Sequence, residues 1–196
     1  SACERAGQWQ LALAVLASMA LLRVAPDVVA CSATISACEK GERWAHALGL
    51  HAAMRRHRVQ PDIITYNASI SACEKGRQWA QALLLMSDLR KRWLVPDVIT
   101  HNSLLSAFEK GAQWESALRA RALMNEDRVC PDLISHAAVI SACEKGHQWE
   151  FAVACLAGLS TERTRPNVIA YSAAISACEK GHQWQRAIVL LRDTEA

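Results

Sequence analysis

Residues 70–79 read Ile70-Ser71-Ala72-Cys73-Glu74-Lys75-Gly76-Arg77-Gln78-Trp79, and near-copies of this stretch recur along the whole chain. The other copies lie at residues 35–44, 105–114, 140–149 and 175–184, and residues 1–9 hold the end of one more. The tryptophans that close these copies stand at a constant interval of 35 residues. A constant period of this size indicates a solenoid, because each unit must bury its apolar face against its neighbours.

The bulk composition is that of a folded protein. Hydrophobic residues make up 52% of the chain and charged residues 21%, which argues against a disordered chain. The formal net charge of +3 permits a polyanionic partner without requiring one. The longest apolar run, residues 11–22, is shorter than the roughly 20 residues that span a bilayer, so we expect no membrane segment.

Five of the eight cysteines occupy one repeated position. They are Cys3, Cys38, Cys73, Cys143 and Cys178. The third unit has Phe108 there, which indicates a buried apolar position. Equivalent positions of stacked helices lie roughly 8–10 Å apart, too far for a disulfide, so we expect free thiols and a reducing compartment.

Two units carry a cysteine followed four residues later by a histidine, namely Cys143 with His147 and Cys178 with His182. This spacing resembles half of a zinc motif. At the histidine position the other units have Glu42, Arg77 and Ala112. We therefore expect neither a metal nor another cofactor.

Each unit is predicted to be an antiparallel helical hairpin. The first helix should begin after Pro61-Asp62, because proline ends the preceding helix and aspartate caps free N–H groups. Tyr66, Ile70 and Cys73 then form one apolar stripe. Gly76 is expected to end this helix in the left-handed conformation.

The second helix of the hairpin should carry a stripe of Trp79, Ala82, Leu83, Met86 and Leu89. The tryptophan is expected to pack between the two helices rather than to stack on a base. At the position of Met86 two other units have His51 and Arg121, and these hairpins should pack less well or expose that position. Trp93 lies off the stripe and is expected on the surface.

These patterns predict an all-α protein, an α-solenoid of 35-residue helix-turn-helix repeats. The expected units are a truncated repeat at 1–27 and repeats at 28–62, 63–97, 98–132, 133–167 and 168–196, the last one also truncated. Both ends of the sequence are expected to be cuts in a longer array.

A 35-residue hairpin with these residues resembles the pentatricopeptide repeat family, over essentially the entire chain. The clearest copies are PDIITYN at 61–67 and PDVITHN at 96–102. The chain departs from the family in having tryptophan where leucine is frequent. It also has Arg58, Trp93, Arg128 and Arg163 where the family often has glycine near the end of the second helix.

The resemblance implies a right-handed superhelix that binds single-stranded RNA, one nucleotide per repeat. It assigns base reading to the fifth residue of a unit together with its last. The implied pairs are Ser32 with Asp62, Asn67 with Asp97, Asn102 with Asp132, and Ala137 with Asn167, and Ser172 stands without a partner. The second residues of the units, implied to sandwich the bases, are Val29, Ile64, Ile99, Ile134 and Ile169.

The residue types agree with a particular RNA sequence. A carboxylate only accepts hydrogen bonds, so aspartate favours bases with an imino N–H on the pairing edge, which are uracil and guanine. Ser32 leaves room for a purine, whereas Asn67 and Asn102 fill more space. Ala137 offers no hydrogen bond. In the family's parallel orientation these residues predict a 5′-G-U-U-N-3′ core.

Lysines recur near the end of each first helix and would form a basic stripe able to contact phosphates. They are Lys40, Lys75, Lys110, Lys145 and Lys180. Each follows a glutamate, which lowers the local field, so a phosphate contact and a merely solvated face remain equal alternatives. For Asn67 and Asn102 the alternative to base reading is support of the helix start.

No catalytic motif appears in the sequence, and we expect no enzyme activity. The family implies an adaptor in organellar RNA processing, editing or stability, in a chloroplast or mitochondrion, and leaves open contacts with other RNA-processing proteins. The rival interpretation is a helical repeat scaffold that binds protein segments. A third is an array that keeps the fold but has lost tight RNA binding.

Overall fold

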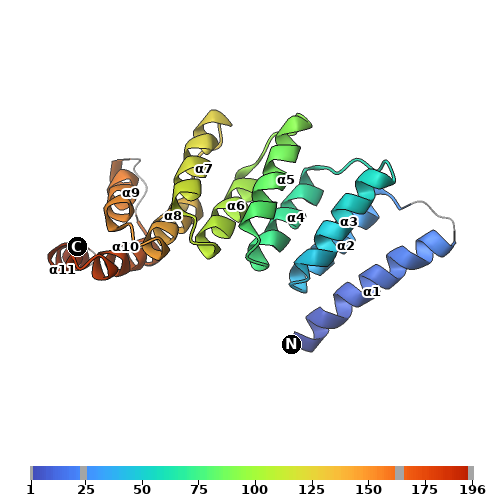
Figure 1. Cartoon of the computed structure of the whole chain (residues 1–196), viewed down its shortest axis with the longest axis horizontal. Coiled ribbons are helices and arrows are strands. Elements are labelled where there is room, and N and C mark those ends of the chain that lie inside the picture. Colours follow the sequence, from blue (N-terminus) through green and yellow to red (C-terminus); the bar gives the residue numbers. More distant parts are fainter. Residues whose placement is uncertain (1, 23–25, 162–165, 194–196) are drawn as a thin grey trace. The chain divides into compact units, whose positions relative to one another are not determined.

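The computed structural model describes residues 2–22, 26–161 and 166–193, with side chains from Trp9 onward except Ala20, Ser160 and Thr161. Every regular element within these residues is a helix (Figure 1). The helices are α1 (Ala2–Leu21), α2 (Val28–Lys40), α3 (Trp44–Arg56), α4 (Ile63–Lys75), α5 (Trp79–Lys91), α6 (Val98–Lys110), α7 (Trp114–Glu126), α8 (Leu133–Lys145), α9 (Trp149–Thr161), α10 (Val168–Lys180) and α11 (Trp184–Asp193). This confirms the predicted all-α repeat fold.

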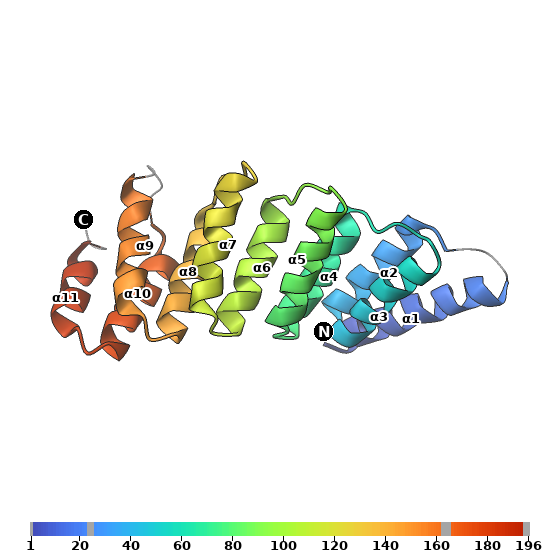
Figure 2. The ribbon, with the colours of Figure 1, turned by 45° about the horizontal axis from the view of Figure 1, so that its top comes forward.

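The chain divides into two compact units, Ser1–Ala107 and Phe108–Ala196. In the first unit α2 pairs with α3 and α4 with α5, and α2 also packs along α4 (Figure 2). In the second unit α8 pairs with α9 and α10 with α11, while α8 packs along α10. Hairpins therefore stack through their first helices. None of the described helices has the length and apolar character needed to cross a membrane.

The first helix of each hairpin begins where an acidic or amide side chain caps it. Asp62 accepts a hydrogen bond from the backbone N–H of Thr65 at 2.8 Å. Asn167 does the same for Ala170 at 2.9 Å. Such caps satisfy N–H groups that have no partner inside the helix. The predicted helix start after Pro61-Asp62 is confirmed.

The predicted stripe of the first helix forms the core. Tyr66, Ile70 and Cys73 are all fully buried. The repeated cysteine position is likewise buried at Cys38, Cys73, Cys143 and Cys178, whose thiols are free. Phe108 takes the same place in the third unit. The side chain of Cys3 lies outside the described residues.

The predicted end of the first helix at Gly76 is confirmed, but the predicted left-handed conformation of the glycine is wrong. Gly76 has a φ of −79°, and the residue after it, Arg77, takes the left-handed conformation with a φ of 55°. The glycine is needed for contact instead, because a Cβ on Gly76 would lie 2.4 Å from two ring atoms of Trp44. The same contact joins Gly41 to Trp9, Gly146 to Trp114, and Gly181 to Trp149. Each of these tryptophans therefore also packs against the end of the next hairpin's first helix.

The predicted stripe of the second helix needs two corrections. Leu83 is exposed, whereas Leu85 is buried beside Met86 and Leu89. His51 is buried, not exposed, and lies 3.0 Å from the hydroxyl of Ser69 on the next hairpin. The reason is that α3 packs against both α2 and α4, so its apolar face is wider than one stripe. Arg121 is half-buried.

In the turns between hairpins, one residue adopts the left-handed backbone conformation that glycine favours, although none of these residues is a glycine. Arg58, Trp93 and Arg128 have φ values of 59°, 60° and 57°. Residue 163 lies outside the described residues. Trp93 is 93% exposed, which confirms its predicted surface location.

Candidate functional site

The second residue of each hairpin has an exposed aliphatic side chain, and we call these five residues the reading row. They are Val29, Ile64, Ile99, Ile134 and Ile169, each 60–71% exposed. All lie in the first turn of the first helix of their hairpin, two residues before the buried core stripe begins. Exposure of large aliphatic side chains to water is unfavourable, so their recurrence at the same exposed repeat position indicates a surface that a ligand covers.

A hollow of about 370 Å³ opens between two members of this row. Ile64 of α4 and Ile99 of α6 line it, together with Asn67, Asp97 and Ser71. The structure thus brings two predicted sandwiching residues and one predicted base-reading pair into a single hollow. Apolar walls with a few polar groups are typical of small-ligand sites.

Asn67 and Asp97 are hydrogen-bonded to each other. The Asn67 amide nitrogen donates to both carboxylate oxygens of Asp97, at 3.2 and 3.1 Å. Thr100 orients the pair: its hydroxyl lies 2.5 Å from the Asn67 carbonyl oxygen, and its backbone N–H donates to Asp97 at 2.8 Å. The pair is therefore held in one arrangement before any ligand arrives.

The same contacts keep Asp97 ionised. Partial burial alone would raise the pKa of this carboxyl group. The hydrogen bonds from the Thr100 backbone, the Thr100 hydroxyl and Asn67 outweigh burial and lower the pKa below its usual value. Asp97 is thus a pure acceptor at neutral pH.

The other predicted pairs differ from this one. The Ser32 hydroxyl donates to the Val29 carbonyl at 3.0 Å, and Asp62 accepts the Thr65 hydroxyl, so the structure does not join Ser32 to Asp62. Asn102 lies half-buried on α6 of the first unit.

In the second unit the predicted reading residues lie at helix starts. Asp132 caps α8, where it also forms a capping box with Ser135. Ala137 is buried, and Asn167 caps α10. Ser172 is exposed.

Three of the five predicted phosphate-contacting lysines are paired with glutamates of the preceding hairpin. The Lys75 ammonium lies 2.5 Å from the Glu39 carboxylate. Lys145 lies 2.8 Å from Glu109, and Lys180 lies 2.8 Å from Glu144. Lys40 and Lys110 are exposed. The sequence showed a glutamate before each lysine but not that the lysine pairs with the glutamate of the preceding repeat. The recurrence of the Glu-Lys dipeptide every 35 residues is the signal that could have indicated this pairing. The positive charge of these three lysines is therefore partly neutralised.

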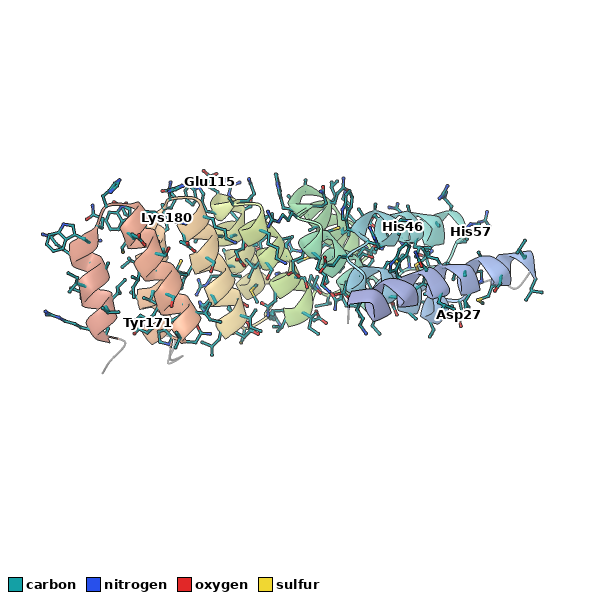
Figure 3. The ribbon with its side chains drawn as sticks, turned by 90° about the horizontal axis from the view of Figure 1, so that it is seen from below. Asp27, His46, His57, Glu115, Tyr171 and Lys180 are labelled. Atoms are coloured by element: carbon teal, nitrogen blue, oxygen red, sulfur yellow. The ribbon has the colours of Figure 1, made fainter. Side chains whose placement is uncertain are left out.

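The lysine row and the reading row lie toward opposite ends of the first helices. Figure 3 shows this on α10, where Tyr171 lies near the start and Lys180 at the end. On α4, Asn67 and Lys75 are separated by about 12 Å along the axis at 1.5 Å per residue. No group of three or more metal-binding side chains gathers within the described part of the chain.

Comparisons with known proteins identify a repeat family and similar solved structures. A model of the PPR repeat family matches residues 26–75 and 61–110. The crystal structure of the pentatricopeptide repeat protein PPR10 from maize is similar over 97% of this chain, with 26% identity and a TM-score of 0.77. PPR10 in complex with an 18-nt psaJ RNA element gives a TM-score of 0.65 at the same identity and 97% coverage.

A more distant likeness concerns the fold alone. The PPR domain of Arabidopsis thaliana protein-only RNase P 1, solved in complex with tRNA, is 17% identical with a TM-score of 0.69, over 83% of this chain and 87% of that one. No curated protein sequence matches the chain. The chain spans 27% of the length of the free PPR10 structure and 26% of the RNA-bound one. The profile match identifies residues 26–110 as pentatricopeptide repeats, and the 35-residue hairpins with the likeness to PPR10 over 97% of this chain support a pentatricopeptide repeat protein.

Proposed function

We propose that this chain binds single-stranded RNA and reads one base with each 35-residue repeat. The observation that carries the proposal is the hollow between Ile64 and Ile99, whose polar wall is the oriented Asn67–Asp97 pair. The solved RNA complex of PPR10, a relative of the same fold, supports it.

A uracil fits the groups that this hollow presents. Its pairing edge offers an imino N–H between two carbonyl oxygens. The ionised Asp97 accepts from the N–H, while the second hydrogen of the Asn67 amide donates to a carbonyl. Cytosine would instead turn a nitrogen lone pair toward the Asp97 carboxylate, which repels it. Ile64 and Ile99 would cover the two faces of the base.

The remaining repeats complete the predicted 5′-G-U-U-N-3′ core. Ser32 is small and leaves a purine room beside Asp62, which favours guanine. Asn102 with Asp132 repeats the residue types of the second pair and favours uracil. Ala137 with Asn167 discriminates least. Each of the repeats 28–62, 63–97, 98–132 and 133–167 would thus take one nucleotide.

Phosphates would meet the lysine row, but at a cost. Lys75 must exchange Glu39 for a phosphate oxygen, so each lysine contributes less than a free cation would. Because aliphatic walls also hold a base less tightly than aromatic ones, which give about 1–3 kcal/mol per base, we expect micromolar or weaker affinity for four bases.

The biological setting is proposed from the family. An adaptor of this kind would bring a transcript to other RNA-processing proteins in a chloroplast or mitochondrion.

The test is binding of this chain to short RNAs with GUU or GCC cores at two salt concentrations. We expect a GUU preference that Asn67→Ala combined with Asn102→Ala abolishes. A sharper variant is Asn67→Ser, which copies the first repeat and should move the preference at the second base from uracil to guanine. Asn125→Ala, at an exposed position on α7, is the matched control.

Three outcomes would contradict the proposal. Equal and steeply salt-dependent binding to both RNAs would leave only contacts with phosphates. Absence of binding would favour the protein-binding scaffold. A GUU preference that survives the double substitution would place the reading residues elsewhere.

A further inference from the structure

The ends of α3 and α5 form a basic surface that lies outside the reading row. Residues 55–58 are Arg-Arg-His-Arg, and residues 90–93 are Arg-Lys-Arg-Trp. Arg56, Arg58 and Lys91 are exposed, and so is Trp93. We call these four residues the basic edge.

Two contacts hold the two segments against each other. The Arg92 guanidinium donates to the Gln60 side chain at 2.8 Å, which ties the second turn to the first. Asp88 lies 3.6 Å from Arg55 and 3.1 Å from Arg92. The basic edge is therefore one surface contributed by two hairpins, not two separate loops.

Nearby negative charge is already committed. Asp88 accepts from Arg92 and from the Tyr66 hydroxyl, so it is bound from two sides. Among the described residues no acidic side chain pairs with Arg56, Arg58 or Lys91. Their charge remains available to a polyanion.

Trp93 narrows the class of partner. Trp93 is 93% exposed, and its own backbone is in the left-handed conformation. Arg92 precedes it in the sequence, and the exposed Val95 follows two residues later. Several exposed cations with a flat aromatic face are what single-stranded nucleic acid requires, because phosphates meet the cations while a base stacks on the ring. An acidic peptide would use the cations but would leave the indole without a stacking partner.

The location relates this surface to the RNA core. Each turn runs directly into a reading residue, from Gln60 to Asp62 and from Val95 to Asp97. The basic edge thus adjoins the repeats proposed to read the first two bases. We propose that it binds nucleotides on the 5′ side of the core, with a base stacked on Trp93 and phosphates on Arg56, Arg58 and Lys91. This inference rests on the proposed RNA binding and its parallel orientation.

The experiment compares three RNAs by fluorescence anisotropy with the whole chain: a GUUA core, the core with six adenosines on its 5′ side, and the core with six on its 3′ side. One stacked base and two or three phosphates should raise the affinity of the 5′-extended RNA about tenfold over the core. The 3′ extension should gain less.

Two variants test the residues. Trp93→Ala, and Arg56→Gln combined with Lys91→Gln, should each remove most of the 5′ gain while the GUU preference of the core stays unchanged. Trp93→Phe should restore part of it. The matched control is Arg119→Gln with Arg192→Gln, which removes the same charge from exposed positions elsewhere and should retain the gain.

Each contrary result has a distinct meaning. A 5′ gain that survives Trp93→Ala and the charge variant, or that the control pair also loses, would overturn the basic edge as the binding surface. Equal displacement by a polyglutamate peptide would show that it recognises charge alone and would also overturn it. The protein could also bind GUU and GCC cores equally well while it still binds the adenosine extension through Trp93. That result would refute base reading by the repeats but would leave the basic edge as a binding surface.

Discussion

The indole ring of Trp44 lies against Gly76 where any larger residue would place its Cβ, 2.4 Å from two ring atoms. Trp44 begins the second helix of one hairpin, and Gly76 ends the first helix of the next. The contact between successive hairpins therefore depends on the absence of a side chain. Its repetition at Gly41, Gly146 and Gly181 makes it a rule of this array.

We predict that Gly76→Ala destabilises the protein by about 1–3 kcal/mol, because Trp44 must move out of a packed position. The φ of −79° suits alanine, so backbone strain does not contribute. Gly49→Ala is the control: nothing lies within 4 Å of its Cβ, and removing a glycine from a helix should stabilise by about 0.5–1 kcal/mol. Urea denaturation measures both.

A double-mutant cycle identifies the cause. In a Trp44→Leu background the cost of Gly76→Ala should fall sharply, because the ring is gone. An unchanged cost would mean that the glycine is required for its backbone and not for this contact.

His51 should make stability depend on pH between about 6.5 and 4. Burial lowers its pKa to about 4, although Asp88 opposes that shift. The unfolded chain binds a proton near pH 6.5 and the folded chain does not, so the free energy of unfolding falls as pH drops through this window. The contribution of this one group is on the order of 3 kcal/mol.

His51→Met removes the titrating group and restores the residue type of the second repeat, where Met86 is buried. Ser69 keeps its bond to the Thr65 carbonyl at 2.7 Å. We expect a flatter dependence of unfolding free energy on pH between 7 and 4.5 than in the unsubstituted protein. Parallel curves for the two proteins would disprove the assignment.

Tyr66→Phe should destabilise the protein by about 1.5–3 kcal/mol, the usual value of a hydrogen bond to a charged group. The Tyr66 hydroxyl donates to the half-buried carboxylate of Asp88 at 2.5 Å. Tyr171 holds the same repeat position on α10 but is only half-buried, so Tyr171→Phe should change stability by less than about 0.5 kcal/mol. Equal effects on the thermal midpoint would argue against the Asp88 contact.

The cysteines should differ widely in reactivity toward an alkylating reagent. Cys130 is exposed. Burial excludes the reagent from Cys73 and raises the pKa of its thiol from the ordinary value of 9.0 to about 12, which lowers the thiolate fraction about a thousandfold. Mass mapping of the native protein should find Cys130 labelled first and Cys73 protected until urea unfolds the chain. Early labelling of Cys73 would show that the first helix of its hairpin opens locally.

The parts of the fold that sequence could predict are those that depend on neighbours within one hairpin. The stripe of Tyr66, Ile70 and Cys73 and the cap at Asp62 are local, and both are confirmed. The errors concern contacts between hairpins. Gly76 fits a left-handed turn and a close contact equally well by sequence, and only the ring of Trp44 decides between them.

The same limit applies to the site. His51 looked unsuited to a core because the sequence does not show that α4 covers it. The lysine row looked basic because the partner of Lys75 is Glu39, 36 residues away. The hollow that contains Asn67 and Asp97 needed the pairing of successive repeats, which the family resemblance supplied and periodicity alone did not.

The last residue of each repeat both starts the next helix and stands in the row proposed to read bases, as Asp62, Asp132 and Asn167 show. A side chain at this position must therefore accept from a backbone N–H, which restricts it to aspartate, asparagine, serine and threonine if the helix is to keep its cap. A redesign of base preference at this last position can therefore use only these four residue types. A wider choice of residue types is available at the fifth residue of the repeat, where Ser32, Asn67 and Ala137 already show that the fold tolerates substitution.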